Sequence, residues 1–207
     1  MIADERADIP STAALEYEYG LFGASDSHAL TFDAGVVCCS CEQCTKWAAY
    51  VACGNEHGQP YYLIPTLELV RALCDWLCVV AVSAQRPLRV LEVGAGDGAL
   101  AHHLQIALEA RHAPITIVAT DSMSRGLHPV PGAHISCRDA TEAVTEHEPQ
   151  IVLCAFMPLG MDWTRSFRAC ESVEAYLLLG ETDDGCCGRP WATWGYLCDG
   201  DDDAAQL

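Results

Sequence analysis

The most constraining feature of the sequence is an apolar run that leads directly into closely spaced glycines. Residues 88–93 read Leu-Arg-Val-Leu-Glu-Val, and Gly94, Gly96 and Gly98 follow at alternate positions. Such a run is typical of a strand buried on both faces of a sheet. Glycine has no Cβ, so the backbone can turn tightly and approach a ligand. The stretch predicts a strand, a ligand-binding turn and then a helix over 98–111.

The rest of the second half alternates between short apolar runs and helical segments. Further strands are expected at Ile115–Thr120, His134–Cys137, Ile151–Phe156 and Tyr176–Leu179, and helices at Ala140–Glu146 and Thr164–Cys170. Alternation of this kind predicts an α/β fold with a mostly parallel sheet and helices on both faces. In such a sheet, ligands bind beyond the carboxyl ends of the strands where the strand order reverses.

The chain of 207 residues divides by character near residue 85. Residues 1–85 are expected to form a mainly helical, cysteine-rich cap region. Within it, Ser11 caps a helix over Thr12–Tyr19, and Pro65 opens a longer amphipathic helix that Pro87 ends. Residues 86–207 are expected to form the alternating domain, followed by an acidic tail.

The glycine loop and its neighbours resemble motif I of the class I S-adenosylmethionine (SAM)-dependent methyltransferases. The resemblance implies a Rossmann-like core that binds SAM. In that family the acid two residues before the first glycine, here Glu92, helps hold the methionine ammonium group. The loop formed by Gly94, Ala95, Gly96 and Gly98 then lies beside the methionine and the ribose.

Two further acids follow expected strands and match the same family pattern. Asp121 ends the second strand, and the resemblance gives it both ribose hydroxyls. Asp139 follows the third strand, and the resemblance places it near the adenine amino group. Each also has a local alternative, because Asp121 can close a turn and Asp139 can be a helix N-cap.

A nicotinamide-dependent oxidoreductase is an alternative for the same loop. The spacing Gly94-x-Gly96-x-x-Ala99 also satisfies the looser dinucleotide-binding pattern. Three observations favour SAM: the carboxylate of Glu92, which disfavours a pyrophosphate; the position of the loop after a helical segment; and the third glycine at Gly98.

The segment after the fourth strand is expected to border the transferred methyl group. Phe156, Met157 and Trp163 are candidates for an acceptor pocket, and Asp162 is a candidate base. Methyl transfer is an in-line displacement, so positioning does much of the work and a base is needed only if the acceptor loses a proton. Core aromatics and a turn aspartate are the alternative. The base-modifying pattern of Asn or Asp followed by Pro-Pro is missing, which argues against a nucleic-acid substrate.

Two other segments resemble an uncharacterised methyltransferase-like group: 157–163, which reads Met-Pro-Leu-Gly-Met-Asp-Trp, and 185–195 with its Gly-Cys-Cys-Gly and Trp-Ala-Thr-Trp-Gly. About a dozen residues follow Gly195, so we expect the full C-terminal β-hairpin of class I methyltransferases to be lacking. A partner or the N-terminal region would then cover the sheet edge. This departure favours a second hypothesis, a catalytically silent SAM-fold binding or scaffold protein. The leading hypothesis is a methyltransferase acting on a small molecule or a protein side chain.

The cysteines allow a metal site but do not require one. Cys41, Cys44, Cys53 and His57 are of the types that bind tetrahedral zinc. The alternative, which we favour, is a set of reduced thiols. The 13 cysteines are odd in number and scattered, so a disulfide framework is not expected. The sequence therefore predicts an intracellular, cytoplasmic protein in a reducing compartment.

The charge excludes several classes of partner. The formal net charge is −18, from 11 basic and 29 acidic residues. Phosphate backbones are held largely by Lys and Arg, so nucleic acids and anionic membranes are not expected as partners. The longest apolar run, Ala72–Ala84, contains Asp75 and is too short to span a bilayer.

Overall fold

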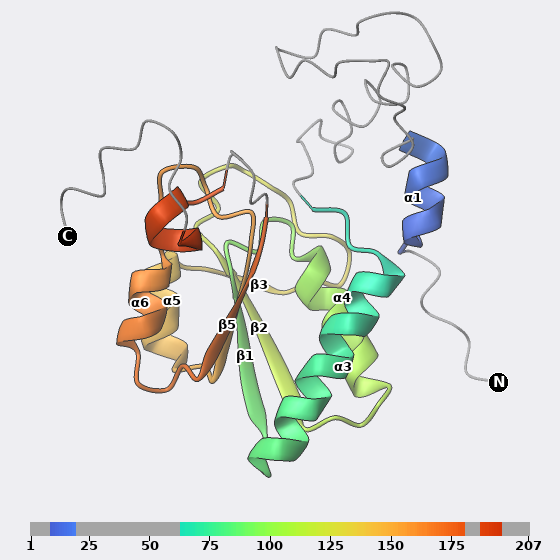
Figure 1. Ribbon diagram of the computed structural model, residues 1–207. Helices are drawn as coiled ribbons and strands as arrows, with labels where there is room; N and C mark the ends of the chain where they lie inside the picture. Colours follow the sequence, from blue (N-terminus) through green and yellow to red (C-terminus); the bar gives the residue numbers. More distant parts are fainter. Residues whose placement is uncertain (1–8, 20–62, 181–186, 196–207) are drawn as a thin grey trace, which may run out of the picture. The chain divides into compact units, whose positions relative to one another are not determined.

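The computed structural model describes residues 9–19, 63–180 and 187–195 (Figure 1). The chain divides into two compact units, Met1–Arg71 and Ala72–Leu207. Helix α3 (Leu67–Ala84) begins in the first unit and continues in the second. The division near residue 85 that we expected from composition stays a prediction.

In the first unit, helix α1 (Thr12–Tyr19) has the bounds expected from the sequence. The Oγ of Ser11 accepts a hydrogen bond from the backbone N–H of Ala14 at 3.1 Å, which is the expected N-cap. The backbone N–H and hydroxyl of Thr12 both donate to Oε2 of Glu68, at 2.8 and 2.9 Å. These hydrogen bonds hold the pKa of Glu68 below its ordinary value.

The second unit is built on a five-stranded sheet. In chain order the strands are β1 (Leu88–Val93), β2 (Ile115–Asp121), β3 (Ile135–Cys137), β4 (Ile151–Ala155) and β5 (Ala175–Leu179). Their order across the sheet is β3-β2-β1-β4-β5, and every pairing is parallel. This is a Rossmann-like α/β fold, as expected. The strand order reverses between β1 and β4, so the switch point lies at their carboxyl ends.

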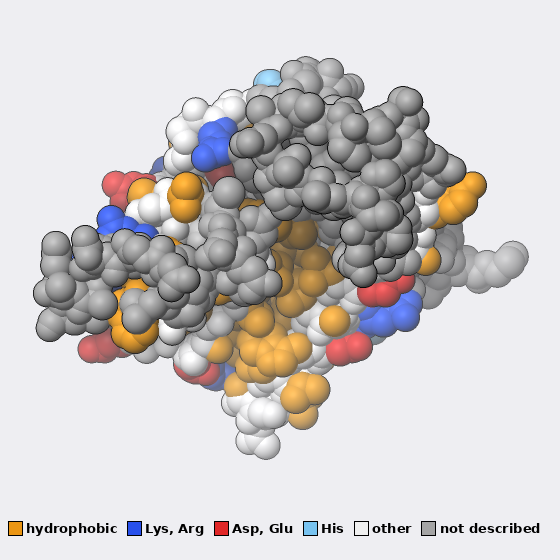
Figure 2. Space-filling view, turned by 45° about the horizontal axis from the view of Figure 1, so that its top comes forward, with side chains coloured by type: hydrophobic (Ala, Val, Ile, Leu, Met, Phe, Trp, Pro, Cys, Tyr) orange, Lys and Arg blue, Asp and Glu red, His pale blue; other side chains and the backbone are white. Residues whose placement is uncertain are grey.

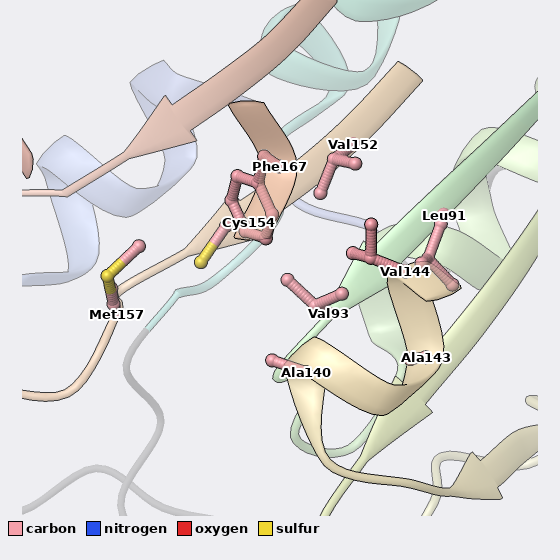
Figure 3. Close-up of a cluster of buried hydrophobic side chains, with 9 residues drawn as sticks. All are labelled: Leu91, Val93, Ala140, Ala143, Val144, Val152, Cys154, Met157 and Phe167. Carbon is pink, nitrogen blue, oxygen red and sulfur yellow. The ribbon is translucent and has the colours of Figure 1, made fainter. Parts of the chain in front are cut away.

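Helices cover both faces of this sheet. Helices α5 (Ala140–His147) and α6 (Thr164–Ala169) lie on one face, and α4 (Ala99–Glu109) lies on the other (Figure 1). On the first face nine buried side chains form a core cluster: Leu91, Val93, Ala140, Ala143, Val144, Val152, Cys154, Met157 and Phe167 (Figure 3). On the second face α4 buries Leu100, Ala101, Leu104 and Leu108.

The pleat of β1 decides where its one acid lies. Leu91 and Val93 belong to the core cluster on the α5 and α6 face. Successive side chains of a strand point to opposite faces, so Glu92 lies on the α4 face. Its carboxylate accepts a hydrogen bond from the backbone N–H of Ala101 in α4.

After β5 the described chain resumes as a short return segment. The π-helix η1 (Pro190–Trp194) follows an antiparallel bridge between Pro158 and Cys187. The indole Nε1 of Trp194 donates to the carbonyl of Cys187 at 2.8 Å. Residues 187–195 add no strand to the sheet, so all the strands in the described part of the chain are parallel. No helix within that part is both long enough and apolar enough to cross a membrane.

Candidate cofactor-binding site

The loop from Gly94 to Gly98 joins the central strand β1 to helix α4, at the switch point of the sheet. Its three glycines all have positive φ, at +63°, +59° and +74°. Side chains other than glycine rarely adopt this backbone conformation, so the loop depends on glycine for its shape. The N–H of Ala95 donates to the carbonyl of Thr120 on β2 at 3.0 Å, which fixes the loop to the neighbouring strand.

Asp121 lies at the end of β2 and reaches the same loop. Its Oδ2 accepts a hydrogen bond from the N–H of Gly96 at 3.0 Å, and its Oδ1 accepts from the N–H of Met123 at 2.6 Å. The structure thus combines the local turn bond with a bond to the glycine loop. A carboxylate has about four acceptor positions, so each oxygen of Asp121 retains capacity for a ligand hydroxyl.

Glu92 lies at the base of the loop and is only 2% exposed. Its Oε2 accepts the N–H of Ala101 at 3.0 Å, which is the one bond to this carboxylate made within the described residues. Burial raises the pKa of Glu92 to about 8, and the nearby charges of Asp97 and Asp121 act in the same direction. Burial therefore favours the protonated form of this carboxyl at neutral pH.

Asp97 is a third carboxyl group at this loop, and we did not predict it from the sequence. Its Oδ1 accepts the N–H of Ala99 at 3.1 Å, at the start of α4. Burial raises its pKa above the ordinary value. The signal was present in the sequence, because Asp97 lies inside the glycine loop, but the family pattern gave that position no role.

Side chains from three other segments pack onto the glycines of the loop. A Cβ built on Gly94 would lie 2.9 Å from Cζ3 of Trp163, and one on Gly96 would lie 3.3 Å from Cδ1 of Leu127. A Cβ on Gly98 would lie 2.9 Å from two carbons of Ile135. The glycines of the loop are therefore closely packed by side chains that lie far from them in the sequence.

The connection between β2 and β3 supplies part of this packing. Residues 122–134 contain no helix, and the N–H of Val130 donates to the carbonyl of Asp97 at 2.9 Å. Leu127 and Val130 were missed by sequence reasoning, because this connection has no hydrophobic periodicity that predicts its path. The side chain of Leu127 lies beside Gly96, and the backbone of Val130 is hydrogen-bonded to that of Asp97.

Asp139 is a helix N-cap, which was the alternative to its role at the adenine. Its Oδ1 accepts the N–H of Thr141 at 2.9 Å, which makes it the N-cap of α5. The side chain is exposed at the carboxyl end of β3. Its second oxygen accepts no hydrogen bond from the described residues, so an adenine contact stays a prediction.

The three candidates for an acceptor pocket lie in different environments. Phe156 directly follows β4, is half-buried, and has a φ of +52°, which is uncommon for a large side chain. Met157 is 2% exposed and belongs to the core cluster (Figure 3), so the structure gives it a packing role. Trp163 is half-buried and lies against Gly94. Of the three, Trp163 is the one in contact with the glycine loop.

Asp162 is held by several neighbours. Its Oδ1 accepts from the N–H and hydroxyl of Thr164 at 3.1 and 2.5 Å, and from the hydroxyl of Thr193 at 3.3 Å. Its Oδ2 lies 3.9 Å from Nη2 of Arg168. These contacts join α6 to η1 and favour a structural role for this carboxylate. Its role as a base remains an untested prediction.

The expected zinc ligands Cys41, Cys44, Cys53 and His57 lie outside the described residues. Within residues 9–19, 63–180 and 187–195, no three His, Cys, Asp or Glu side chains are grouped so as to hold a metal ion. Among the thiols described, Cys74, Cys154 and Cys187 are buried, Cys78 and Cys170 are half-buried, and Cys137 is exposed. Burial raises the pKa of Cys74 to about 11 and raises that of Cys154 further.

Figure 2 turns the upper end of Figure 1 toward the reader, which is the end where β1 finishes. Apolar side chains gather near the middle of this face, and acidic and basic side chains lie at its margins. Ligand sites are mostly apolar with a few placed polar groups. Glu92, Asp97 and Asp121 place acidic groups at the glycine loop, and exposed Asp139 follows β3 at the same end of the sheet.

Comparison with known proteins gives matches among solved structures. No family model matches the chain, and no curated protein matches it. Among solved structures it is similar to the citrinin polyketide synthase CMeT domain, with 19% identity and a TM-score of 0.41. The match covers 61% of this chain and 37% of the other, so the chain spans well under half of that protein's length.

Proposed function

We propose that the second unit binds SAM at the Gly94–Gly98 loop and transfers its methyl group to a small molecule or a protein side chain. The observation that carries the proposal is the bond from the N–H of Gly96 to Oδ2 of Asp121. It supports the proposal because it brings a carboxylate, the candidate acceptor for a diol, beside the glycine backbone at the ends of β1 and β2. A bound nucleoside needs both features: the carboxylate accepts hydrogen bonds from the ribose hydroxyls, and the glycine backbone leaves room for the groups attached to the ribose.

The residues present fit this cofactor. Asp121 has acceptor capacity for the ribose hydroxyls, and exposed Asp139 has an oxygen available for the adenine amino group. Glu92 lies at the base of the loop, and a cation nearby favours its ionised form. We propose it for the methionine ammonium group. When bound, SAM supplies a methyl group on a positively charged sulfur.

The charge of this site distinguishes SAM from a dinucleotide. Three carboxyl groups, Glu92, Asp97 and Asp121, lie close enough to raise the pKa of Glu92 together with its burial. A bound sulfonium or ammonium group would stabilise the ionised forms of these acids, whereas a pyrophosphate would be repelled by them. NAD is therefore the natural control ligand, and we expect it not to bind.

A catalytically silent SAM-binding protein is a second candidate. The hydrogen bonds that hold Asp162 favour it, since they occupy the one base that the sequence suggested. Acceptors that are nucleophilic without losing a proton need no base, so methyl transfer to a thiolate or a neutral amine remains the first candidate.

Methyl-labelled SAM separates these candidates. The protein would be incubated with the label and with pools of small thiols and amines or with size-fractionated proteins. Label incorporated by the wild type and not by Gly96→Val supports the transferase. SAM binding without incorporation into any pool across the pH range tested supports the silent protein.

A further inference from the structure

The ring of Trp163 lies against the first glycine of the loop. Its ring atoms Cζ3 and Cη2 are 2.9 and 3.2 Å from the position of a Cβ built on Gly94. The ring therefore packs directly on the Cα of Gly94, the first residue after β1. In the proposed site this contact favours a place beside the cofactor, whereas the sequence suggested the acceptor side.

The backbone of Trp163 is firmly placed. Its N–H points to Sδ of buried Met157 at 3.4 Å, and its carbonyl accepts the hydroxyl of Ser166 at 2.7 Å. The residue begins the turn that leads into α6. The indole is thus held beside the loop, where the half-buried side chain also packs against the core cluster.

The charges around the loop favour a cation beside this ring. Glu92 and Asp97 lie at the same loop, and burial raises the pKa of both, so that a nearby cation would stabilise their ionised forms. A tryptophan ring attracts a cation placed over its face within about 6 Å, more strongly than Tyr or Phe does. The ring and the carboxyl groups therefore act in the same direction on a ligand that carries positive charge.

We propose that the indole of Trp163 forms the wall of the cofactor site at the sulfonium and makes the site prefer SAM to the neutral S-adenosylhomocysteine. This inference rests on the proposed function, because it names the side chain that reads the charge of that cofactor. Asp121 and Asp139 would contact parts that both ligands share. Trp163 contacts the part in which they differ.

The test compares dissociation constants for SAM and S-adenosylhomocysteine in the wild type, Trp163→Phe, Trp163→Leu and the control Trp191→Leu. Trp191 is 43% exposed and lies in η1. We expect Trp163→Leu to lower the affinity for SAM about 5- to 30-fold and the affinity for S-adenosylhomocysteine less than about threefold. Trp163→Phe should be intermediate, and Trp191→Leu should match the wild type.

The outcomes distinguish the role of Trp163 from the proposed binding of SAM. A wild type that binds neither ligand overturns both. A wild type that binds SAM, with Trp163 variants that weaken both ligands equally or weaken neither, overturns the role of Trp163 alone. If Trp163→Leu fails to fold, Trp163→Phe decides, since it keeps an aromatic ring and a smaller loss of selectivity for SAM is expected.

Discussion

The N–H of Gly96 donates to Oδ2 of Asp121 across a distance of 3.0 Å, and this bond ties the glycine loop to the end of β2. The other oxygen of Asp121 accepts a hydrogen bond from the N–H of Met123. One carboxylate thus organises the backbone on both sides of the expected ribose position.

Replacing Asp121 by Ala removes both of these bonds. We expect the free energy of unfolding to fall by roughly 2–4 kcal/mol, because two backbone donors lose a charged acceptor. The affinities for SAM and S-adenosylhomocysteine should fall by the same factor, about tenfold or more, since both ligands carry the ribose. Denaturant unfolding and calorimetric titration measure the two effects.

Asp75→Ala is the control for this variant. Asp75 is an exposed partner of Arg111 at 2.7 Å, and an exposed ion pair contributes at most about 1 kcal/mol. A difference between SAM and S-adenosylhomocysteine in the Asp121 variant would contradict the ribose role.

Replacing Gly94 by Ala introduces a Cβ that meets the ring of Trp163 at 2.9 Å, in a backbone with φ of +63°. Gly160→Ala is a matched control, because its φ is +78° and nothing lies within 4 Å of the added Cβ. Both variants carry the left-handed backbone penalty of about 1–2 kcal/mol. Only Gly94→Ala should lose more stability than this and shift the tryptophan fluorescence. Equal losses and unchanged fluorescence in both would refute the contact between Gly94 and Trp163.

Glu92→Gln tests the buried carboxyl group through the pH dependence of stability. The ordinary pKa of this carboxyl is 4.5, whereas in the folded protein it is about 8. Between these values the folded state holds a proton that the unfolded state has released, so Glu92 makes stability fall as pH rises. The slope that it adds is at most about 1.4 kcal/mol per pH unit.

In Glu92→Gln this part of the slope disappears, because glutamine keeps an oxygen for the N–H of Ala101 and does not titrate. The variant should approach or exceed the stability of the wild type at pH 8 and should gain little at pH 4.5. Unfolding curves across this pH range measure the difference, with exposed Glu109→Gln as the control. Parallel slopes for wild type and Glu92→Gln would show that burial does not raise the pKa of Glu92.

Asp139→Asn separates the two roles of its side chain. Asparagine is about as good an N-cap as aspartate, so the stability of the protein should change by less than about 0.5 kcal/mol. An oxygen that accepts from the adenine amino group would be replaced by an amide, and affinity for both SAM and S-adenosylhomocysteine should fall about three- to tenfold. Unchanged affinity would leave Asp139 as a helix cap alone.

Much of the fold follows from local patterns in the sequence. The bounds of β1 and α1 are those expected, and the other predicted strands and helices differ by a residue or two, because apolar runs between turn residues define each element. The π-helix η1 was not expected. The cap at Ser11 also follows from local chemistry. The parallel order of the sheet follows from the alternation of strand and helix.

Contacts between distant segments could not be read from the sequence. Met157 follows a strand, as a lining residue would, yet it is buried in the core cluster. Asp162 has the composition of a base, yet Thr193 from η1 donates to it. The packing of Trp163 on Gly94 depends on the path of the segment between β4 and α6. Such contacts are set by tertiary packing, which no local pattern encodes.

Calorimetric titration of SAM into the wild type, Gly96→Val and Gly160→Val tests the central claim most directly. The added side chain at Gly96 meets Leu127 and fills the loop, whereas Gly160 faces open space. We predict one SAM bound per chain in the wild type and Gly160→Val, no binding in folded Gly96→Val, and no binding of NAD by the wild type. Absence of SAM binding by the folded wild type, or equal SAM affinity in Gly96→Val, would contradict the account.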